Sequence, residues 1–240
     1  MLRRPVSGDI GSRFIFLSNS DERGFVFDAE GRCLSDVDPS YRPFRHLSII
    51  SDTSLAGIRT NRGGSTVFEL ANIEGRAFFS RELPPAPLPS ADANIRGGGF
   101  AIGHDAAYFA PPVSRVLFRV SPTDVEMIDL SYLELGTPEF DLPHSIGPNN
   151  RRLAENMASE ITRNDGVFLL ENGSLFLQYY TPEVGYTRII LDPDNPEDYR
   201  LSKSRLGFME MKGGKAYHVE APARNATGNP GIAVYRLAGE

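Results

Sequence analysis

The chain contains few of the residues that build cross-linked, metal-bound or membrane-spanning proteins. Cys33 is the only cysteine among the 240 residues, which excludes an internal disulfide and a zinc site built from cysteines. No apolar run approaches the roughly 18 residues that a membrane-spanning helix needs. We therefore expect no membrane span.

The motifs of common enzymes and cofactor sites are also missing. The sequence contains no GxSxG turn and no glycine-rich phosphate loop. The acidic stretch Asp192–Asp198 lacks the glycine and the spacing of a calcium loop, so we interpret it as a charged hairpin turn. The histidines show neither HxxxH nor HExxH spacing and would have to meet from distant segments to bind a metal; they are His46, His104, His144 and His218. We predict no catalytic residue, no metal and no cofactor.

Positive charge is in deficit, since the formal net charge is −6 at pH 7. A general nucleic-acid binder needs a basic surface, so we expect no nucleic-acid partner. The first residues, MLRRPVSGDIGS, include arginines but no apolar segment behind them, and as they stand they are not a signal peptide. We expect a cytoplasmic protein if Met1 is the true start and an extracytoplasmic one if a signal has been lost.

The stretch from Gly97 to Leu130 is the clearest copy of a structural unit. It contains four short apolar runs, each bounded by Gly, Pro, Asp or Ser: FAI, AAYFA, RVLFRV and VEMIDL. Strands joined by such tight turns pair antiparallel, because a parallel crossover needs a dozen or more residues. The stretch therefore predicts a four-stranded meander.

The third run of this unit recurs along the chain. An apolar residue, an aromatic, a polar residue and another apolar residue occur in Val116–Val120, Val67–Leu70 and Val234–Leu237, and more weakly in Val26–Ala29 and Ile189–Asp192. A recurrence of roughly 40 to 50 residues, with about four strands in each period, is typical of a β-propeller blade. A β-sandwich with similar strand spacing is the alternative.

Turn residues recur in the same order as the strands. They are Asp52, Asp105 and Asn172 after the first run of their units, and Glu30-Gly31-Arg32 and Glu74-Gly75-Arg76 after the third. Because both patterns agree, we predict an all-β protein, a β-propeller of four-stranded antiparallel blades, with about five blades present of an expected six. We assign residues 1–240 to a single domain.

The ends and the longest gap depart from the repeat. We expect residues 1–12 to be irregular, so that the opening blade lacks its first strand and about one blade is absent at the N-terminus. If Met1 is the true start, a five-bladed or open ring is the alternative. The last unit lacks a fourth strand. The gap 136–165 is an insertion, in which Leu153, Met157 and Ile161 have the spacing of a short amphipathic helix.

The units resemble those of the TolB-like six-bladed β-propeller superfamily, particularly bacterial members with NHL-like blades. The likeness is carried by Gly99-Phe100-Ala101-Ile102, Ala107-Tyr108-Phe109-Ala110 and Arg115–Val120, and it spans Arg13 to Leu237. It implies a fold much more than a function. Many bacterial relatives are exported, which the resemblance implies here only if a leader has been lost.

Blade topology sorts the charged loops onto two sides. Connections between the second and third strands, and between blades, lie on one side, and that side is rich in arginine. An arginine-bearing mouth would favour an anionic group such as a carboxylate, a sulfate or an acidic sugar. The candidate ligand-binding residues are Arg23, Tyr41, Arg45, Arg59, Arg62, Arg96 and Arg224. The alternative is a set of solvated loop charges.

The leading hypothesis is a non-catalytic binding module, sensor or scaffold that recognises a protein or small anionic ligand at this arginine-bearing side. The first alternative is a metal-dependent propeller hydrolase or lyase of the lactonase type, in which channel carboxylates hold a divalent ion. The second is a truncated fragment without function. The sequence leaves the oligomeric state and the ligand open.

Overall fold

The computed structural model describes most of the chain, and every structural statement below concerns these residues. They are 5–10, 14–19, 24–28, 30, 32–36, 44–51, 53–60, 65–73, 76–88, 92, 97–133, 135, 161–182, 184–208, 210–212, 215–220 and 231–236.

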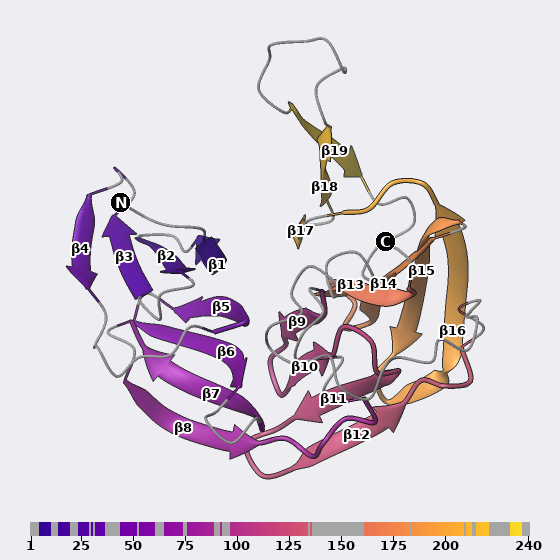
Figure 1. The fold of residues 1–240 in the computed structure, drawn as a ribbon, viewed down its shortest axis with the longest axis horizontal. Helices are drawn as coiled ribbons and strands as arrows, with labels where there is room; N and C mark the ends of the chain where they lie inside the picture. The colour runs from indigo at the N-terminus through magenta and orange to yellow at the C-terminus, as the bar shows by residue number, and fades with distance from the viewer. Residues whose placement is uncertain are drawn as a thin grey trace. The chain divides into compact units, whose positions relative to one another are not determined.

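The described strands form five sheets whose strands are hydrogen-bonded in chain order (Figure 1). Sheet 1 contains β1 (Pro5–Ile10), β2 (Phe14–Asn19), β3 (Gly24–Asp28) and β4 (Cys33–Asp36). Sheet 2 contains β5 (His46–Ser51), β6 (Ser54–Thr60), β7 (Thr66–Asn72) and β8 (Ala77–Glu82). Sheet 3 contains β9 (Gly99–Ile102), β10 (Ala107–Ala110), β11 (Val116–Val120) and β12 (Val125–Asp129).

Sheets 4 and 5 complete the described part of the chain. Sheet 4 contains β13 (Arg163–Leu169), β14 (Leu175–Thr181), β15 (Gly185–Asp192) and β16 (Asn195–Ser204). Sheet 5 contains β17 (Glu210–Lys212), β18 (Lys215–Glu220) and β19 (Gly231–Arg236). The predicted four-stranded antiparallel meander is therefore confirmed, and so are the three strands expected in the last unit.

The N-terminal prediction is wrong, because residues 5–10 are not irregular. β1 pairs antiparallel with β2, with Gly8 opposite Leu17 and Ile10 opposite Ile15, so sheet 1 has its first strand. The segment was missed because it lacks an apolar run. A strand at one end of a sheet is held by its backbone ladder on one side and does not require such a run.

The long insertion ends earlier than predicted. β13 begins at Arg163, inside the predicted range 136–165, and a bulge between Asn164 and Gly166 separates its polar start from its apolar end. Leu153 and Met157 lie outside the described residues. Ile161 is buried and belongs to no helix.

The repeat extends to the hydrogen bonds of the turns. The amide of Asp28 donates to the carbonyl of Arg32 (3.0 Å), whose own amide donates to Asp28 Oδ1 (2.8 Å). Asn72 and Arg76 make the same two bonds in sheet 2, also at 3.0 Å and 2.8 Å. Asp and Asn both favour this turn because their side-chain oxygen accepts from a nearby backbone amide.

The first strands lie side by side in sheets 1 and 2, in sheets 3 and 4, and in sheets 4 and 5. β1 lies beside β5, and β13 lies beside both β9 and β17. Residues 97–99 make the approach of β9 to β13 close: the amide of Gly98 donates to the carbonyl of Asn164 (2.7 Å), and a Cβ on Gly99 would lie 2.1 Å from the nitrogen of Val167. First strands placed this way are the inner strands of propeller blades.

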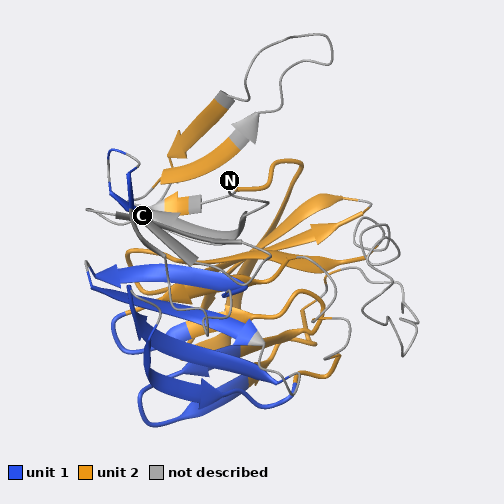
Figure 2. Cartoon of the chain, turned by 60° about the vertical axis from the view of Figure 1, so that its left-hand side comes forward, with its two compact units in different colours: residues 1–85, 104–107, 118–127 blue, residues 86–103, 108–117, 128–240 orange. Residues whose placement is uncertain are grey.

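The chain divides into two compact units, coloured separately in Figure 2: residues 1–85, 104–107 and 118–127, and residues 86–103, 108–117 and 128–240. The single-domain assignment remains a prediction. The core of the first unit includes Phe44, Leu47, Leu55 and Ala71. The core of the second includes Leu170, Phe176, Phe208, Met211 and Ala216, contributed by sheets 4 and 5 and the segment between them. Each fully buried aliphatic or Phe side chain contributes about 1.5 to 3 kcal/mol.

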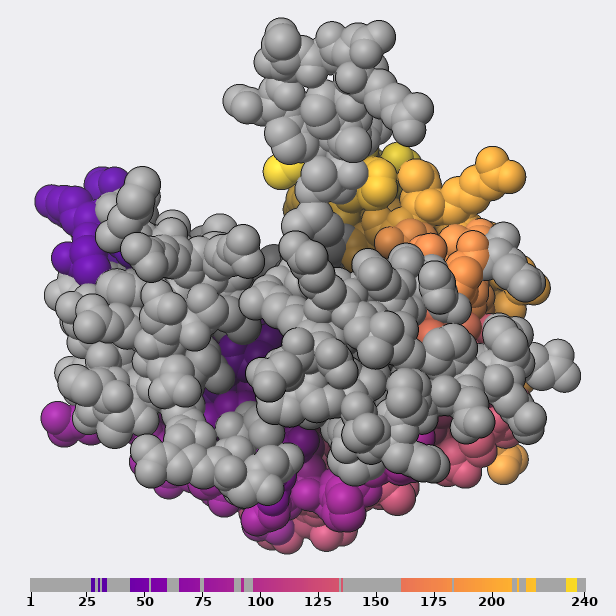
Figure 3. Space-filling model, viewed as in Figure 1, coloured from indigo at the N-terminus to yellow at the C-terminus, as the bar shows by residue number. Residues whose placement is uncertain are grey.

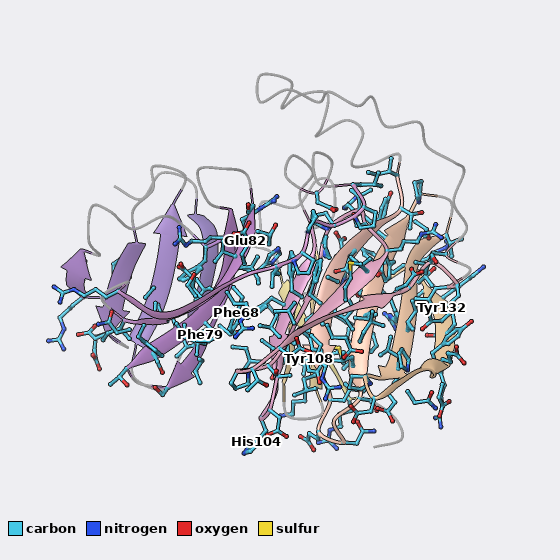
Figure 4. The ribbon with its side chains drawn as sticks, turned by 90° about the horizontal axis from the view of Figure 1, so that it is seen from below. Phe68, Phe79, Glu82, His104, Tyr108 and Tyr132 are labelled. Atoms are coloured by element: carbon cyan, nitrogen blue, oxygen red, sulfur yellow. The ribbon has the colours of Figure 1, made fainter. Side chains whose placement is uncertain are left out.

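Aromatic contacts pack the described sheets at several points. Phe68 and Phe79, labelled in Figure 4, meet edge to face across β7 and β8 with their centroids 6.1 Å apart. In the second unit the rings of Tyr132 and Tyr199 are 5.7 Å apart, and Tyr132 Oη donates to the carbonyl of Pro196 (2.5 Å). No helix among the described residues is long and apolar enough to cross a membrane.

Candidate functional site

Five of the seven candidate ligand-binding residues fall in connections between strands. Arg23, Arg62 and Arg224 fall between the second and third strands of their sheets, while Tyr41 and Arg96 fall between sheets. These five positions lie outside the described residues. Arg45 and Arg59 are described, and both are half-buried.

Arg45 and Arg59 lie at the same end of sheet 2. Arg45 directly precedes β5, and its amide donates to the carbonyl of Ile58 (2.7 Å), which extends the ladder between β5 and β6. Arg59 is the next residue of β6. The structure therefore brings two of the candidate arginines to neighbouring strands at one end of sheet 2.

Arg59 has a buried counter-charge, Glu69, which the strand pattern alone did not predict. Arg59 Nε donates to Glu69 Oε2 (2.5 Å), and Nη2 donates to Oε1. The Glu69 carboxylate is 6% exposed, against 25% for the arginine, and it also accepts from Ser80 Oγ (3.3 Å). Glu69 therefore compensates the charge of Arg59. A glutamate inside the apolar strand Val67–Leu70 is a signal that could have predicted this pair.

Asp92 organises the connection between the second and third strands of sheet 3, in the second unit. Its Oδ1 accepts from the amides of Val113 (2.7 Å) and Ser114 (3.0 Å), and its Oδ2 accepts from Ser114 Oγ (2.5 Å). Ser114 Oγ in turn accepts from the amide of Leu88 (2.9 Å). This buried carboxylate fixes the loop between β10 and β11 with charge-assisted hydrogen bonds.

Asn164 and Tyr179 form a buried polar pair beside this loop. The amide of Asn164 donates to the carbonyl of Pro112 (2.7 Å), and its Oδ1 accepts from the amide of Gly166 (3.2 Å). Burial raises the pKa of Tyr179 to about 12, although the side-chain amide of Asn164 opposes that shift. Even so, neither Asn164 Nδ2 nor Tyr179 Oη reaches a partner at hydrogen-bond geometry among the described residues.

The face of sheet 4 opposite to Asn164 and Tyr179 carries a cluster of one arginine and two tyrosines. The Arg163 guanidinium lies 4.5 Å from the centroid of Tyr180, which meets Tyr186 edge to face at 5.6 Å. Arg163 Nε also donates to Asp165 Oδ1 (3.0 Å). Burial raises the pKa of the Asp165 carboxyl, although Arg163 opposes that shift. A Cβ added at Gly207 would lie only 2.4 Å from the ring of Tyr186, so the backbone of Gly207 packs directly on that ring.

Arg188 is held against the segment that leads into sheet 5. Its guanidinium lies 4.1 Å from the centroid of Phe208, and Nη2 donates to the carbonyl of Leu206 (2.7 Å). Gln178 binds both backbone groups of Phe208, at 3.0 Å and 2.7 Å. Burial lowers the pKa of Arg188. This arginine therefore serves the packing of sheets 4 and 5.

Metal-binding geometry is not seen in the described part of the chain, which contains no group of three His, Cys, Asp or Glu side chains close enough to hold an ion. His104 Nδ1 lies 2.6 Å from Asp105 Oδ1, and both side chains are exposed, as the turn interpretation expects. His218 Nδ1 lies 2.6 Å from the carbonyl of Gly207.

Comparisons with known proteins give structural likeness only. No protein-family model matches the chain, and no curated protein matches it in sequence. A protein of unknown function from Bacteroides caccae is similar over 89% of this chain and 69% of its own length, with 12% identity and a TM-score of 0.54. The structure of YCF48 bound to D1 peptide is similar over 99% of this chain and 65% of its own, with 10% identity and a TM-score of 0.51.

A weaker likeness is to the WD40 β-propeller domain of Doa1, over 78% of this chain and 50% of that one, with 11% identity and a TM-score of 0.47. The chain thus spans between half and about two thirds of the length of these structures. At such identities the likeness concerns the fold. Together with the successive four-stranded meanders and their adjacent first strands, it shows that the chain has a β-propeller fold.

Proposed function

We propose that the chain is a non-catalytic β-propeller binding module that recognises an anionic group, on a protein or a small molecule, at its arginine-bearing side. The observation that carries the proposal is that Arg45 and Arg59 lie on neighbouring strands at one end of sheet 2, the end at which β6 enters the connection that contains Arg62. Guanidinium groups bind carboxylates and phosphates through paired hydrogen bonds.

The Arg59–Glu69 ion pair gives Arg59 a different role from the arginines of the loops. Because Glu69 neutralises Arg59, this arginine positions the end of β6 rather than binding a free anion. The loop arginines Arg62 and Arg96 then provide the charge that attracts the ligand. A peptide is one candidate ligand, by analogy with YCF48, whose solved structure holds a D1 peptide. Membership of the TolB-like superfamily is part of this proposal.

A panel of ligands tests the function. Purified protein is heated with carboxylates, sulfates, acidic sugars and an acidic peptide, each beside a neutral analogue of the same size. Binding to the folded state raises the midpoint temperature of unfolding. A ligand at a hundred times its Kd adds about 2.7 kcal/mol to the free energy of unfolding. We expect the anionic members of the panel to stabilise the protein, and we expect added salt to weaken this stabilisation. Equal effects of the neutral analogues would contradict the proposal.

A further inference from the structure

The exposed face of sheet 5 differs from every equivalent surface that the structure describes. The third strands β7 and β11 are mostly buried, β15 alternates between half-buried and buried residues up to Leu191, and each of the three pairs with a fourth strand. β19 is the third strand of sheet 5 and stands at one end of its described strand order. Its side chains alternate between exposed and half-buried from Ile232 to Arg236.

The two faces of sheet 5 have different roles. Tyr235 packs against Phe208, with the ring centroids 5.8 Å apart, and joins the core that sheets 4 and 5 share. The other face carries Ile232 and Val234, which are 70% and 54% exposed. Val234 lies opposite the half-buried Tyr217 on β18. Yellow atoms of residues 232–236 are visible at the molecular surface in Figure 3.

This apolar face ends in a pair of like charges. Lys215 and Arg236 lie directly opposite each other on β18 and β19, and both are exposed. Like charges in directly opposed positions destabilise a sheet. A carboxylate beside Arg236 would offset the repulsion, while apolar side chains beside Ile232 and Val234 would cover exposed surface.

We propose that β19 is a docking edge for an extended peptide that pairs with it antiparallel and carries alternating apolar residues and a carboxylate at the position opposite Arg236. Backbone hydrogen bonds supply affinity in strand addition, and the alternate side chains supply specificity. The charged end of this surface is distinct from the arginine-bearing side, because Arg236 lies opposite Lys215, which follows the connection between the first and second strands of its sheet. The proposal does not depend on the function proposed above.

A charge-swap experiment on the full chain tests the docking edge. The probe is a fluorescent peptide that alternates Val and Thr and ends in Glu; its twin ends in Lys. We expect the Glu peptide to bind about tenfold more tightly than the Lys peptide, and Arg236→Glu to reverse this preference. Amide exchange at β19 should slow when the Glu peptide is added.

Two further variants complete the test. Val234→Lys should abolish binding, whereas Met127→Lys, which places the same charge at an exposed methionine on β12, should leave it unchanged. Arg236→Glu alters one exposed side chain, so it stays informative if Val234→Lys fails to fold. The proposal is overturned if the Glu peptide does not bind, if Arg236→Glu leaves the preference intact, or if the chain dimerises through β19, which would make a second copy the occupant.

Discussion

Asn164 and Tyr179 stand directly opposite each other on β13 and β14, yet Asn164 Nδ2 and Tyr179 Oη lack hydrogen-bond partners among the described residues. Three hydrogen bonds fix Asn164. Its backbone amide donates to the carbonyl of Pro112, its carbonyl accepts from the amide of Gly98, and its Oδ1 accepts from the amide of Gly166. The pair therefore joins the loop after β10, the start of β9 and sheet 4 through one residue. It is a point where small changes have measurable effects.

Tyr179→Phe should change the response to alkali. The folded pKa of Tyr179, about 12, lies above the ordinary value of 10.0, so its contribution is complete below pH 10 and is lost as pH rises through 12. The loss is roughly 3 kcal/mol, at about 1.4 kcal/mol for each pKa unit. Unfolding by urea across this range should show a shallower decline for Tyr179→Phe. Parallel declines in the two proteins would contradict the prediction.

Gly99→Ala should be strongly destabilising, because the added carbon would meet the backbone of β13 at 2.1 Å from Val167 N. We expect a cost of about 3 kcal/mol from overpacking. Gly173→Ala is the matched control: its φ is +86° but nothing lies within 4 Å, so the cost is about 1 kcal/mol of backbone strain. Urea unfolding of both variants gives the comparison, and equal losses would show that β9 and β13 can separate.

Arg59→Met should cost about 2 to 3 kcal/mol, because it leaves the Glu69 carboxylate buried without its counter-charge. Arg59→Met with Glu69→Leu should recover most of that loss, since two apolar side chains replace both charges. Arg76→Met, at an exposed arginine of the same sheet, controls for loss of charge and should change stability by less than about 0.5 kcal/mol. The cycle is measured by urea unfolding. A double variant as unstable as Arg59→Met would argue against the pair.

Asp28→Asn should remove an acid-sensitive contribution from sheet 1. The amide of Arg32, followed by its side chain, holds the pKa of Asp28 below the ordinary 3.8, although burial opposes the shift. This contribution is present above pH 3.8 and is lost as pH falls through the folded pKa. Asn72 fills the same position in sheet 2, so Asn72→Asp should introduce the acid sensitivity that Asp28→Asn removes. Thermal unfolding followed from about pH 5 to well below pH 3.8 checks both variants.

The sequence predicted the strands well where apolar runs end at turn residues. β10 and β11 are examples, since their apolar runs are bounded by Asp, Pro or Ser and are almost wholly buried. β1 was missed because backbone pairing with β2 forms it without an apolar run. The site was harder to predict because pairing depends on register: Arg59 meets Glu69 only when β6 and β7 align Gly57 opposite Glu69. Likewise, the burial of Asn164 follows from the approach of β9, which no local pattern encodes.

The most direct test of the account is the dissociation constant of an anionic ligand from the panel, measured by calorimetry for the wild type, Arg62→Ala/Arg96→Ala and Arg32→Ala/Arg76→Ala. Both double variants remove two positive charges, but Arg32 and Arg76 lie in the turns between third and fourth strands, at the other end of their sheets. The account predicts that Arg62→Ala/Arg96→Ala weakens binding about tenfold or more while the control changes it less than about twofold. Equal weakening in the two variants, or none in either, would contradict recognition at the arginine-bearing side.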